Sequence, residues 1–293
     1  MALTWMQTNV LRPCVGANIL IINKKGRKMA NAPRLADDLA LAHMLADAAA
    51  AAIRPYYRAD FALEDKADNS PVTAADRAAE GAIRQILASE RPSDGILGEE
   101  YGAERNGASR CWVIDPIDGT SSFIAGRPIF GTLIALLIDG FPVLGLIDQP
   151  ILRERWTGAM GEPTRFNGEV ARTRRCTALD QAILATTSPH AFDAHQGEHF
   201  LSLAAKVAPR RIIYGGDCYN YALLASGHID IVAEANLHLH DFAALVPIVE
   251  GAGGLMCDWT GEPLHAASGG DAIALGDPAR LEEVLEALAC THS

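Results

Sequence analysis

Two long apolar runs joined by a turn dipeptide constrain this chain more than any other feature. Gly131–Ile138 and residues 143–148 are rich in leucine, isoleucine and valine, and Asp139-Gly140 stands between them. Continuous apolar runs of this length are typical of buried strands. An Asp-Gly pair allows the backbone angles of a two-residue hairpin turn. The sequence therefore predicts a β-hairpin near the middle of the chain.

The rest of the first half combines two helices with shorter strands. An alanine- and leucine-rich stretch predicts a helix across residues 35–58, ended by Pro55, and Thr73 is a suitable N-cap for a second helix that runs to Arg91-Pro92. Short strands are expected at residues 111–115 and 155–159, with a turn at Asn167-Gly168. The first half is therefore expected to be rich in hairpins, with helices at its start.

The second half alternates strand with helix. Strands are expected at residues 183–187, 211–214, 229–233, 254–258 and 272–275, and helices at 199–207, 218–226, 241–252 and 278–289. Such alternation favours an α/β sheet with helices on its faces. The predicted fold class is α+β with an α/β second half. Because no low-complexity linker separates the halves, we expect two sub-domains packed as one body, at residues 29–178 and 179–293.

Composition and missing motifs narrow the function classes. The 293 residues include 36 acidic and 25 basic side chains, and this net charge of −11 argues against a nucleic-acid partner, which would need a basic stripe. The six cysteines form no CxxC pair, which favours a reducing cytoplasm. The longest apolar run, residues 129–138, is too short to span a bilayer. Without P-loop, GxGxxG or GxSxG patterns, the NTPase, dinucleotide-binding and serine-hydrolase classes lose support.

Residues 1–28 differ in character from the rest of the chain. A short apolar run precedes a cluster of basic residues, which is the wrong order for a signal peptide. Met29 opens a segment that leads directly into the first predicted helix. We therefore expect residues 1–28 to be a disordered or mis-assigned extension.

The stretch Trp-Val-Ile-Asp-Pro-Ile-Asp-Gly-Thr at residues 112–120 contains the most informative candidate functional residues. Asp115 and Asp118 stand at the mouth of a buried strand, which the proline between them is expected to end. Two such carboxylates repel each other and are costly to desolvate, so a cation is the natural compensation. Gly119-Thr120 allows a tight turn into a helix, whose free N–H groups attract an anion. The pattern indicates a metal-and-phosphate site, although an isolated DxxDG more often caps a turn.

Three further stretches place carboxylates in comparable positions. Glu99-Glu100 follows a strand-like segment, Asp76 falls in the first turn of the helix after Thr73, and Asp241 opens an apolar helix that ends in a glycine-rich turn. Each alone has a simpler explanation as a solvated loop, a helix-dipole partner or an N-cap. Their occurrence together, in this order, is the stronger signal.

These motifs resemble the inositol monophosphatase family of Mg²⁺-dependent phosphomonoesterases. The resemblance runs from about residue 35 to 290 and rests on Glu99-Glu100, the Asp115-to-Thr120 motif, and Asp241 followed by Gly253-Gly254. Within the family, residues 149–156, 216–224 and 243–254 look closest to the histidinol-phosphatase branch. The resemblance implies a layered αβαβα sandwich, as in the inositol monophosphatase and fructose-bisphosphatase-like phosphatases, and a homodimer.

The resemblance also implies the metal ligands. Glu99, Asp115 and the Ile117 carbonyl would hold one Mg²⁺, while Asp115, Asp118 and Asp241 would hold a second, with Asp115 bridging. Oxygen ligands with open water positions suit Mg²⁺ rather than zinc.

Catalysis would depend on residues beside the metals. The implied catalytic residues are Asp76, Glu99 and Thr120, with Thr120 hydrogen-bonded to Asp76 and orienting the attacking water. Backbone N–H groups of Gly119 and Thr120 would bind the phosphate oxygens. Glu100 would lie beside the ligands and could assist as a base.

Substrate selection would fall to the second half. Glu234 lies seven residues before Asp241, the family spacing for an acid that contacts the non-phosphate part of the substrate, and Asp217 follows Gly216 in a flexible turn. Two carboxylates suit the amine of a cationic alcohol such as histidinol, although each could be a cap or a surface acid. The expected substrate is L-histidinol phosphate; an inositol phosphate, whose ring would also bond to Glu234, is the alternative. The predicted substrate-binding residues are Asp118, Gly119, Thr120, Gly216, Asp217, Glu234 and Asp241.

One position departs from the family pattern. His240 stands directly before Asp241, where the family commonly has an aromatic residue such as Trp or Tyr. The alternation His238-Leu-His240 can suggest a transition-metal pair, but a hydrogen-bonded or exposed histidine is the more common explanation.

Other classes fit these residues less well. A non-catalytic scaffold would be expected to lose a metal ligand, and all are present. A two-metal nuclease would need a basic groove. Bisphosphate nucleotidase or fructose-bisphosphatase activity would need basic residues in the second half, for which Arg210 and Arg211 are the candidates.

Overall fold

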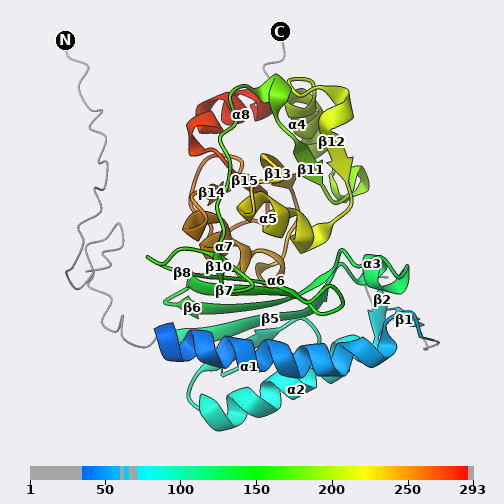
Figure 1. The fold of residues 1–293 in the computed structure, drawn as a ribbon, viewed down its shortest axis with the longest axis vertical. Coiled ribbons are helices and arrows are strands. Elements are labelled where there is room, and N and C mark those ends of the chain that lie inside the picture. Colours follow the sequence, from blue (N-terminus) through cyan, green and yellow to red (C-terminus); the bar gives the residue numbers. More distant parts are fainter. Residues whose placement is uncertain (1–34, 60–62, 66–70, 106, 290–293) are drawn as a thin grey trace.

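The computed structural model describes residues 35–59, 63–65, 71–105 and 107–289. The predicted extension at residues 1–28 lies outside this part of the chain. The described residues form five layers, in which a helix pair, a large sheet, a helix layer, a smaller sheet and a second helix pair follow one another (Figure 1). This is the predicted αβαβα sandwich.

The first layer consists of α1 (Leu35–Ile53) and α2 (Ala74–Glu90), which pack against each other and cover one face of the large sheet (Figure 1). Both helices were expected. The α-helical geometry of α1 ends at Ile53, earlier than the predicted residue 58, and Pro55 lies in a 3₁₀ turn, Arg54–Tyr56. Proline has no N–H to continue the helical hydrogen-bond ladder, so the α-helix ends before it.

The large sheet has eight strands in the order β10-β9-β8-β7-β6-β5-β3-β4. All its pairings are antiparallel except that of β3 with β5. Its strands are β3 (Gly95–Gly98), β4 (Gly102–Glu104), β5 (Arg110–Asp118), β6 (Gly131–Ile138), β7 (Phe141–Gln149), β8 (Glu154–Ala159), β9 (Arg165–Phe166) and β10 (Glu169–Val170). The predicted hairpin is β6–β7, and its turn residues Asp139 and Gly140 have φ angles of 51° and 83°. A separate pair, β1 (Leu63–Asp65) and β2 (Pro71–Thr73), is antiparallel.

Strand β5 corrects one expectation. Pro116 does not end the strand, because pairing with β6 resumes at Asp118 after a register shift between Asp115 and Asp118. A bulge accommodates a residue without an N–H donor. The Pro116 carbonyl accepts a hydrogen bond from the buried Thr132 hydroxyl at 2.8 Å. The bulge therefore brings both aspartates to the end of one continuous strand.

The smaller sheet has five strands in the order β12-β11-β13-β15-β14. Strands β12, β11 and β13 are parallel, whereas β15 is antiparallel to β13 and β14. Their bounds are β11 (Leu184–Thr186), β12 (Ile212–Tyr214), β13 (Ile231–Glu234), β14 (Leu255–Cys257) and β15 (Ala272–Leu275). Each predicted strand of the second half is present, with ends shifted by at most two residues.

The second-half helices differ from expectation at two places. Helix α4 (Ala194–Ala204) begins before the predicted residue 199, because Asp193 and Gln196 form a capping box. The single helix expected at 241–252 is split into α6 (Leu239–Phe242) and α7 (Leu245–Gly251). Pro247 supplies no N–H for the Ala243 carbonyl, so the ladder breaks between them.

The remaining helices lie close to their predicted positions. They are α3 (Thr120–Ile124), α5 (Asp217–Ala225) and α8 (Leu281–Leu288), with 3₁₀ turns at Leu179–Gln181, Pro189–Ala191, Pro209–Arg211 and Pro278–Arg280. Helices α5 and α7 occupy the layer between the two sheets, and α4 and α8 cover the outer face of the smaller sheet (Figure 1).

Three apolar cores hold the layers together. The first packs α1 and α2 on the large sheet through Leu45 and Ile83. The second joins the two sheets around Ile248 of α7, and the third lies between the smaller sheet and the last helix pair, with Phe200 and Val284. The predicted division into sub-domains at residues 178 and 179 stays a prediction.

None of the helices among the described residues has the length and apolar character needed to cross a membrane. The described cysteines, Cys111, Cys176, Cys218 and Cys257, are free thiols. The cytoplasmic location expected from the sequence stays a prediction.

Candidate active site

The end of β5 places two carboxylates and a helix start side by side. Asp115 is 2% exposed, and its Oδ1 accepts a hydrogen bond from the Ile117 N–H at 3.0 Å. Asp118 ends the strand, and its Oδ2 accepts from the Cys218 N–H of α5 at 2.5 Å. Both carboxylates accept hydrogen bonds from backbone N–H groups. Their positions are therefore set by the backbone and do not depend on flexible donor side chains.

Gly119 turns the chain from β5 into α3. Its φ angle is 89°, and a Cβ at this position would lie 2.7 Å from the Asp217 Oδ2. Only glycine combines that backbone angle with so close an approach. The next residue, Thr120, begins α3, and its hydroxyl donates to the Ile117 carbonyl at 3.1 Å. The turn therefore brings the start of α3 next to Asp217.

Glu99 reaches the same end of the sheet from the neighbouring strand. It follows β3, and its N–H donates to the Ile114 carbonyl of β5 at 3.1 Å. The next residues are held by Glu80 of α2, a fully buried carboxylate that accepts from the Glu100 N–H at 2.7 Å and the Tyr101 N–H at 3.2 Å. The turn that presents Glu99 is therefore anchored to α2.

Asp241 enters the cluster from the second half of the chain. It lies on α6, which packs against β5, and its Oδ2 accepts from the His238 N–H at 2.7 Å. Carboxylate oxygens of Asp115, Asp118 and Asp241 all lie within 4.8 Å of one another. The structure thus brings together the residues that the resemblance assigns to the second metal. A second group within the same limit contains Glu99, Asp115 and His240.

Burial and mutual repulsion dominate the electrostatics of this cluster. The pKa of Asp115 is raised well above its usual value, chiefly by burial and then by the charges of Glu99, Asp118 and Asp241. Burial also raises the pKa of Asp118, with repulsion from Asp217 and Asp241 adding to it. The pKa of Asp241 is raised by burial, against an opposing effect of His240. A divalent cation would relieve this repulsion, and oxygen donors suit Mg²⁺. The residues therefore fit the metal that the resemblance implies.

Asp217 lies against Gly119 and Ser122, at the turn that follows Asp118. It begins α5 with a φ angle of 44°, and its Oδ2 accepts a hydrogen bond from the Ser122 hydroxyl at 3.2 Å. Gly216 before it has a φ angle of 122°, which turns the chain into the helix. Burial raises the pKa of Asp217 to about 6, although the Ser122 hydrogen bond and the charge of Arg127 oppose this. Asp217 is thus neither a simple cap nor a solvated surface acid.

Glu234 ends β13 and is 6% exposed. Its Oε1 accepts from the Thr187 N–H at 2.9 Å and from the Thr187 hydroxyl at 2.8 Å. Burial raises its pKa to about 7 against these hydrogen bonds, and the charges of Asp217 and Asp241 add to the increase. Glu234 and Asp217 therefore lie close enough to interact electrostatically.

Asp76 occupies its predicted place in the first turn of α2, where it is 1% exposed. The expected hydrogen bond between Asp76 and Thr120 stays a prediction, since the bond that the Thr120 hydroxyl makes here goes to Ile117.

The sequence did not single out two residues that shape the site. Glu80 lies four residues after Asp76 on the buried face of α2, and an acid among apolar helix positions signals a buried partner. Tyr221 of α5 is 2% exposed, and its hydroxyl has no hydrogen-bond partner within the described residues. Burial raises its pKa, followed by the charges of Glu234, Asp118 and Asp241, which places the ring beside the acids. A tyrosine on an apolar helix face gave no such signal.

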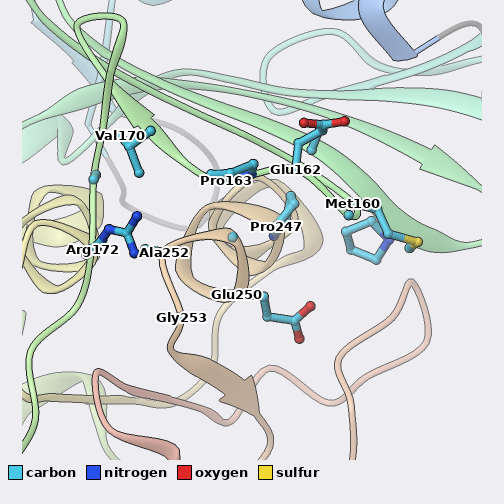
Figure 2. Close-up of a pocket in the computed structure, with 14 residues that line it drawn as sticks. Met160, Glu162, Pro163, Val170, Arg172, Pro247, Glu250, Ala252 and Gly253 are labelled. Carbon is cyan, nitrogen blue, oxygen red and sulfur yellow. The ribbon is translucent and has the colours of Figure 1, made fainter. Parts of the chain in front are cut away.

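A cavity elsewhere in the molecule is separate from this cluster. It measures about 420 Å³ and lies between the end of β8 and α7. Figure 2 shows Glu162, Arg172 and Glu250 around it. Burial raises the pKa of Glu250. None of the predicted site residues lines this cavity, so it is not the candidate active site.

A match to a known family shows to which group of proteins the chain with this carboxylate cluster belongs. The sequence model of the inositol monophosphatase family matches residues 35–292. The chain belongs to the inositol monophosphatase family. The resemblance carried by the motifs is thereby confirmed.

Three relatives illustrate the range of the family. The chloroplastic bifunctional phosphatase IMPL2 of Arabidopsis thaliana is 48% identical over 258 residues, which are 85% of this chain and 74% of that protein. The histidinol-phosphatase of Mycobacterium tuberculosis is 39% identical, over 81% of this chain and 93% of that protein. A solved structure of an inositol monophosphatase from Zymomonas mobilis is 55% identical and superposes with a TM-score of 0.81, over 89% of this chain and 100% of that chain.

Membership in the inositol monophosphatase family makes this chain a phosphomonoesterase. Enzymes of the family use Mg²⁺ and act on small phosphorylated substrates, and the acidic groups around Asp115 could bind the metal.

Proposed function

We propose that this phosphomonoesterase hydrolyses L-histidinol phosphate to L-histidinol and phosphate. The observation that carries the proposal is a pair of acids beside the carboxylate cluster, the half-buried Asp217 and the buried Glu234, with pKa values raised to about 6 and about 7. A cationic substrate compensates buried carboxylates, whereas a neutral polyol leaves their charge unbalanced. The amine of histidinol supplies that charge.

The phosphate group would lie at the turn between β5 and α3. In this proposal the backbone N–H groups of Gly119 and Thr120 bind the phosphate oxygens, as the start of a helix favours. The Gly119 backbone is kept open by its lack of a side chain, since a Cβ there would collide with Asp217. The alcohol part of the ester then extends toward Asp217 and Glu234.

Water attack at phosphorus would break the bond to the alcohol oxygen. We propose that Thr120, with Asp76 behind it, orients the attacking water. Glu99, Asp115, the Ile117 carbonyl, Asp118 and Asp241 would hold Mg²⁺, and Asp118 and Asp241 would also contact the ester. Bound Mg²⁺ supplies activation of the water and stabilisation of the leaving oxygen.

The comparisons support this proposal without distinguishing it from its main alternative. A relative at 39% identity is named a histidinol-phosphatase. A solved structure at 55% identity is named an inositol monophosphatase, and this observation favours inositol 1-phosphate as the second candidate. Glu234 could also accept hydrogen bonds from ring hydroxyls. A bisphosphate nucleotidase activity has weaker support, because Arg210 and Arg211 lie in an exposed 3₁₀ turn, where Arg211 donates to the Gln181 carbonyl.

The resemblance also implies a homodimer, which we include in the proposal. Sedimentation velocity of the full chain tests it directly. A single species at the mass of the 31.2 kDa chain would exclude the dimer.

Phosphate release from L-histidinol phosphate and inositol 1-phosphate, measured side by side with Mg²⁺ and after EDTA, tests the proposal. We expect preferred turnover of L-histidinol phosphate and loss of both activities after chelation. Equal or preferred turnover of the inositol ester would exclude the substrate assignment. Activity that survives chelation would exclude the metal-dependent mechanism.

A further inference from the structure

A histidine lies at the edge of the carboxylate cluster. His240 is on α6 directly before Asp241, and its side chain is 19% exposed. Its Nε2 lies 3.4 Å from the Asp241 Oδ1. A ring nitrogen of His240 and carboxylate oxygens of Glu99 and Asp115 all lie within 4.8 Å of one another. The imidazole therefore faces the space between Glu99 and Asp115.

The two metal-binding groups of this site consequently differ in their donor atoms. Asp115, Asp118 and Asp241 offer oxygen alone, whereas Glu99, Asp115 and His240 offer two carboxylates and a nitrogen. Mg²⁺ prefers oxygen ligands and seldom takes imidazole, while first-row transition-metal ions accept both.

We propose that His240 is a metal ligand, so that the Glu99–Asp115 position accepts a first-row transition-metal ion such as Mn²⁺ as well as Mg²⁺. The all-oxygen position at Asp115, Asp118 and Asp241 keeps Mg²⁺. This inference rests on the proposed function, because it presupposes a metal-dependent site at these carboxylates.

The neighbouring His238 provides an internal comparison. Its ring stacks on that of His240, with centroids 5.3 Å apart and planes at 29°. It belongs to neither metal-binding group. The alternation His238-Leu-His240 thus does not form a metal pair, and only one of the two rings lies with the carboxylates.

A competing explanation gives His240 a purely electrostatic role. A protonated imidazole would pair with Asp241 at the observed 3.4 Å and would have no lone pair for a metal. The two explanations differ in one measurable property, the presence of a nitrogen bonded to the bound ion.

Electron spin echo modulation of bound Mn²⁺ detects such a nitrogen directly. The full chain is loaded with less than one equivalent of Mn²⁺ in the presence of Mg²⁺. We expect ¹⁴N modulation from a coordinated imidazole in the wild type and in His238→Gln, and its loss in His240→Gln. Titration should show Mn²⁺ affinity about tenfold lower in His240→Gln, with Mg²⁺ affinity changed by less than about twofold.

Each outcome separates this inference from the proposed function. Mn²⁺ that binds without ¹⁴N modulation in the wild type overturns the inference, as does modulation that survives in His240→Gln. Either result leaves the phosphatase proposal standing. If neither Mn²⁺ nor Mg²⁺ binds the wild-type chain, the inference and the proposed function both fail. If His240→Gln does not fold, the wild-type spectrum together with that of His238→Gln decides the matter.

Discussion

Asp241 is the carboxylate that joins the second half of the chain to the cluster on β5. Its oxygens lie with those of Asp115 and Asp118, although more than 100 residues separate it from them in sequence. Its neighbour His238 holds it through a backbone N–H, so the side chain has little freedom. Asp241 therefore contributes a negative charge at a fixed position in the cluster.

Asp241→Asn should leave a folded protein with kcat reduced about 100-fold or more, because an amide oxygen is a weaker metal ligand than a carboxylate. Steady-state phosphate release and circular dichroism measure the two properties. Asp180→Asn, at an exposed 3₁₀ turn, is the matched control and should keep full activity. Full activity in Asp241→Asn would remove it from the metal site.

The raised pKa of Glu234 predicts how stability depends on pH. This pKa is about 7 in the folded protein against an ordinary 4.5, so the folded state holds the proton more tightly. The resulting stabilisation is complete below pH 4.5 and is lost as the pH rises through 7. Glu234→Gln does not ionise. As the pH rises across this range, the free energy of unfolding of Glu234→Gln should therefore increase relative to that of the wild type by about 3 kcal/mol.

Urea unfolding in EDTA at several pH values checks this expectation. Glu90→Gln, at the exposed end of α2, should show no comparable change with pH. A difference between Glu234→Gln and the wild type that stays constant from pH 4.5 to 7 would contradict the assignment of Glu234 as a buried acid.

Among the elements, the turn from β5 into α3 has the strictest geometry. Gly119 and Gly168 have nearly equal φ angles, 89° and 88°, but a Cβ at Gly119 would meet Asp217 whereas one at Gly168 would meet nothing within 4 Å. Both substitutions to alanine cost about 1 kcal/mol of backbone strain. Only Gly119→Ala should also reduce kcat/KM, by about tenfold or more, since it displaces Asp217 and narrows the phosphate position.

Thermal unfolding and phosphate release of the two alanine variants test this pair. Equal kcat/KM in Gly119→Ala and Gly168→Ala would show that the contact with Asp217 has no catalytic consequence.

Most helices and strands could be predicted because short stretches of sequence contain the signals for them. Asp139-Gly140 specified the β6–β7 turn, and the apolar runs beside it specified the strands. One error arose where a tertiary contact decides, because β5 continues past Pro116, whose carbonyl accepts a hydrogen bond from Thr132 of β6. The early start of α4 had a local signal, the capping box of Asp193 and Gln196. The break at Pro247 had a local signal, its missing N–H, that helix periodicity concealed.

The candidate site could likewise be predicted from the sequence only in part. Carboxylates at strand ends are visible in the sequence, and the structure brings Asp115, Asp118 and Asp241 together. Glu80 was not visible as a positioning residue, because its role depends on the turn between β3 and β4, which meets α2 only in the folded chain. Tyr221 likewise acquires its polar surroundings only when α5 packs between the sheets.

At the scale of the whole molecule, the site is the place where the two halves of the chain meet. Glu99, Asp115 and Asp118 come from the large sheet, and Asp241 comes from α6 in the second half. A metal bound between them links the halves in the folded state alone, and such binding stabilises a protein by mass action.

Mg²⁺ should therefore raise the melting temperature by several degrees at concentrations well above its dissociation constant. Differential scanning calorimetry with Mg²⁺ and with EDTA measures the shift. Asp241→Asn should lose most of it, whereas Asp180→Asn should retain it. A melting temperature independent of Mg²⁺ in the wild type would argue against a metal that bridges the halves.

We propose above that Asp217 and Glu234 make this phosphatase selective for a cationic alcohol. The most direct measurement is the ratio of kcat/KM for L-histidinol phosphate to that for the same ester without its amine. A buried acid pair that recognises the amine predicts a ratio of at least about ten in favour of L-histidinol phosphate. A ratio within about twofold of one would contradict the account.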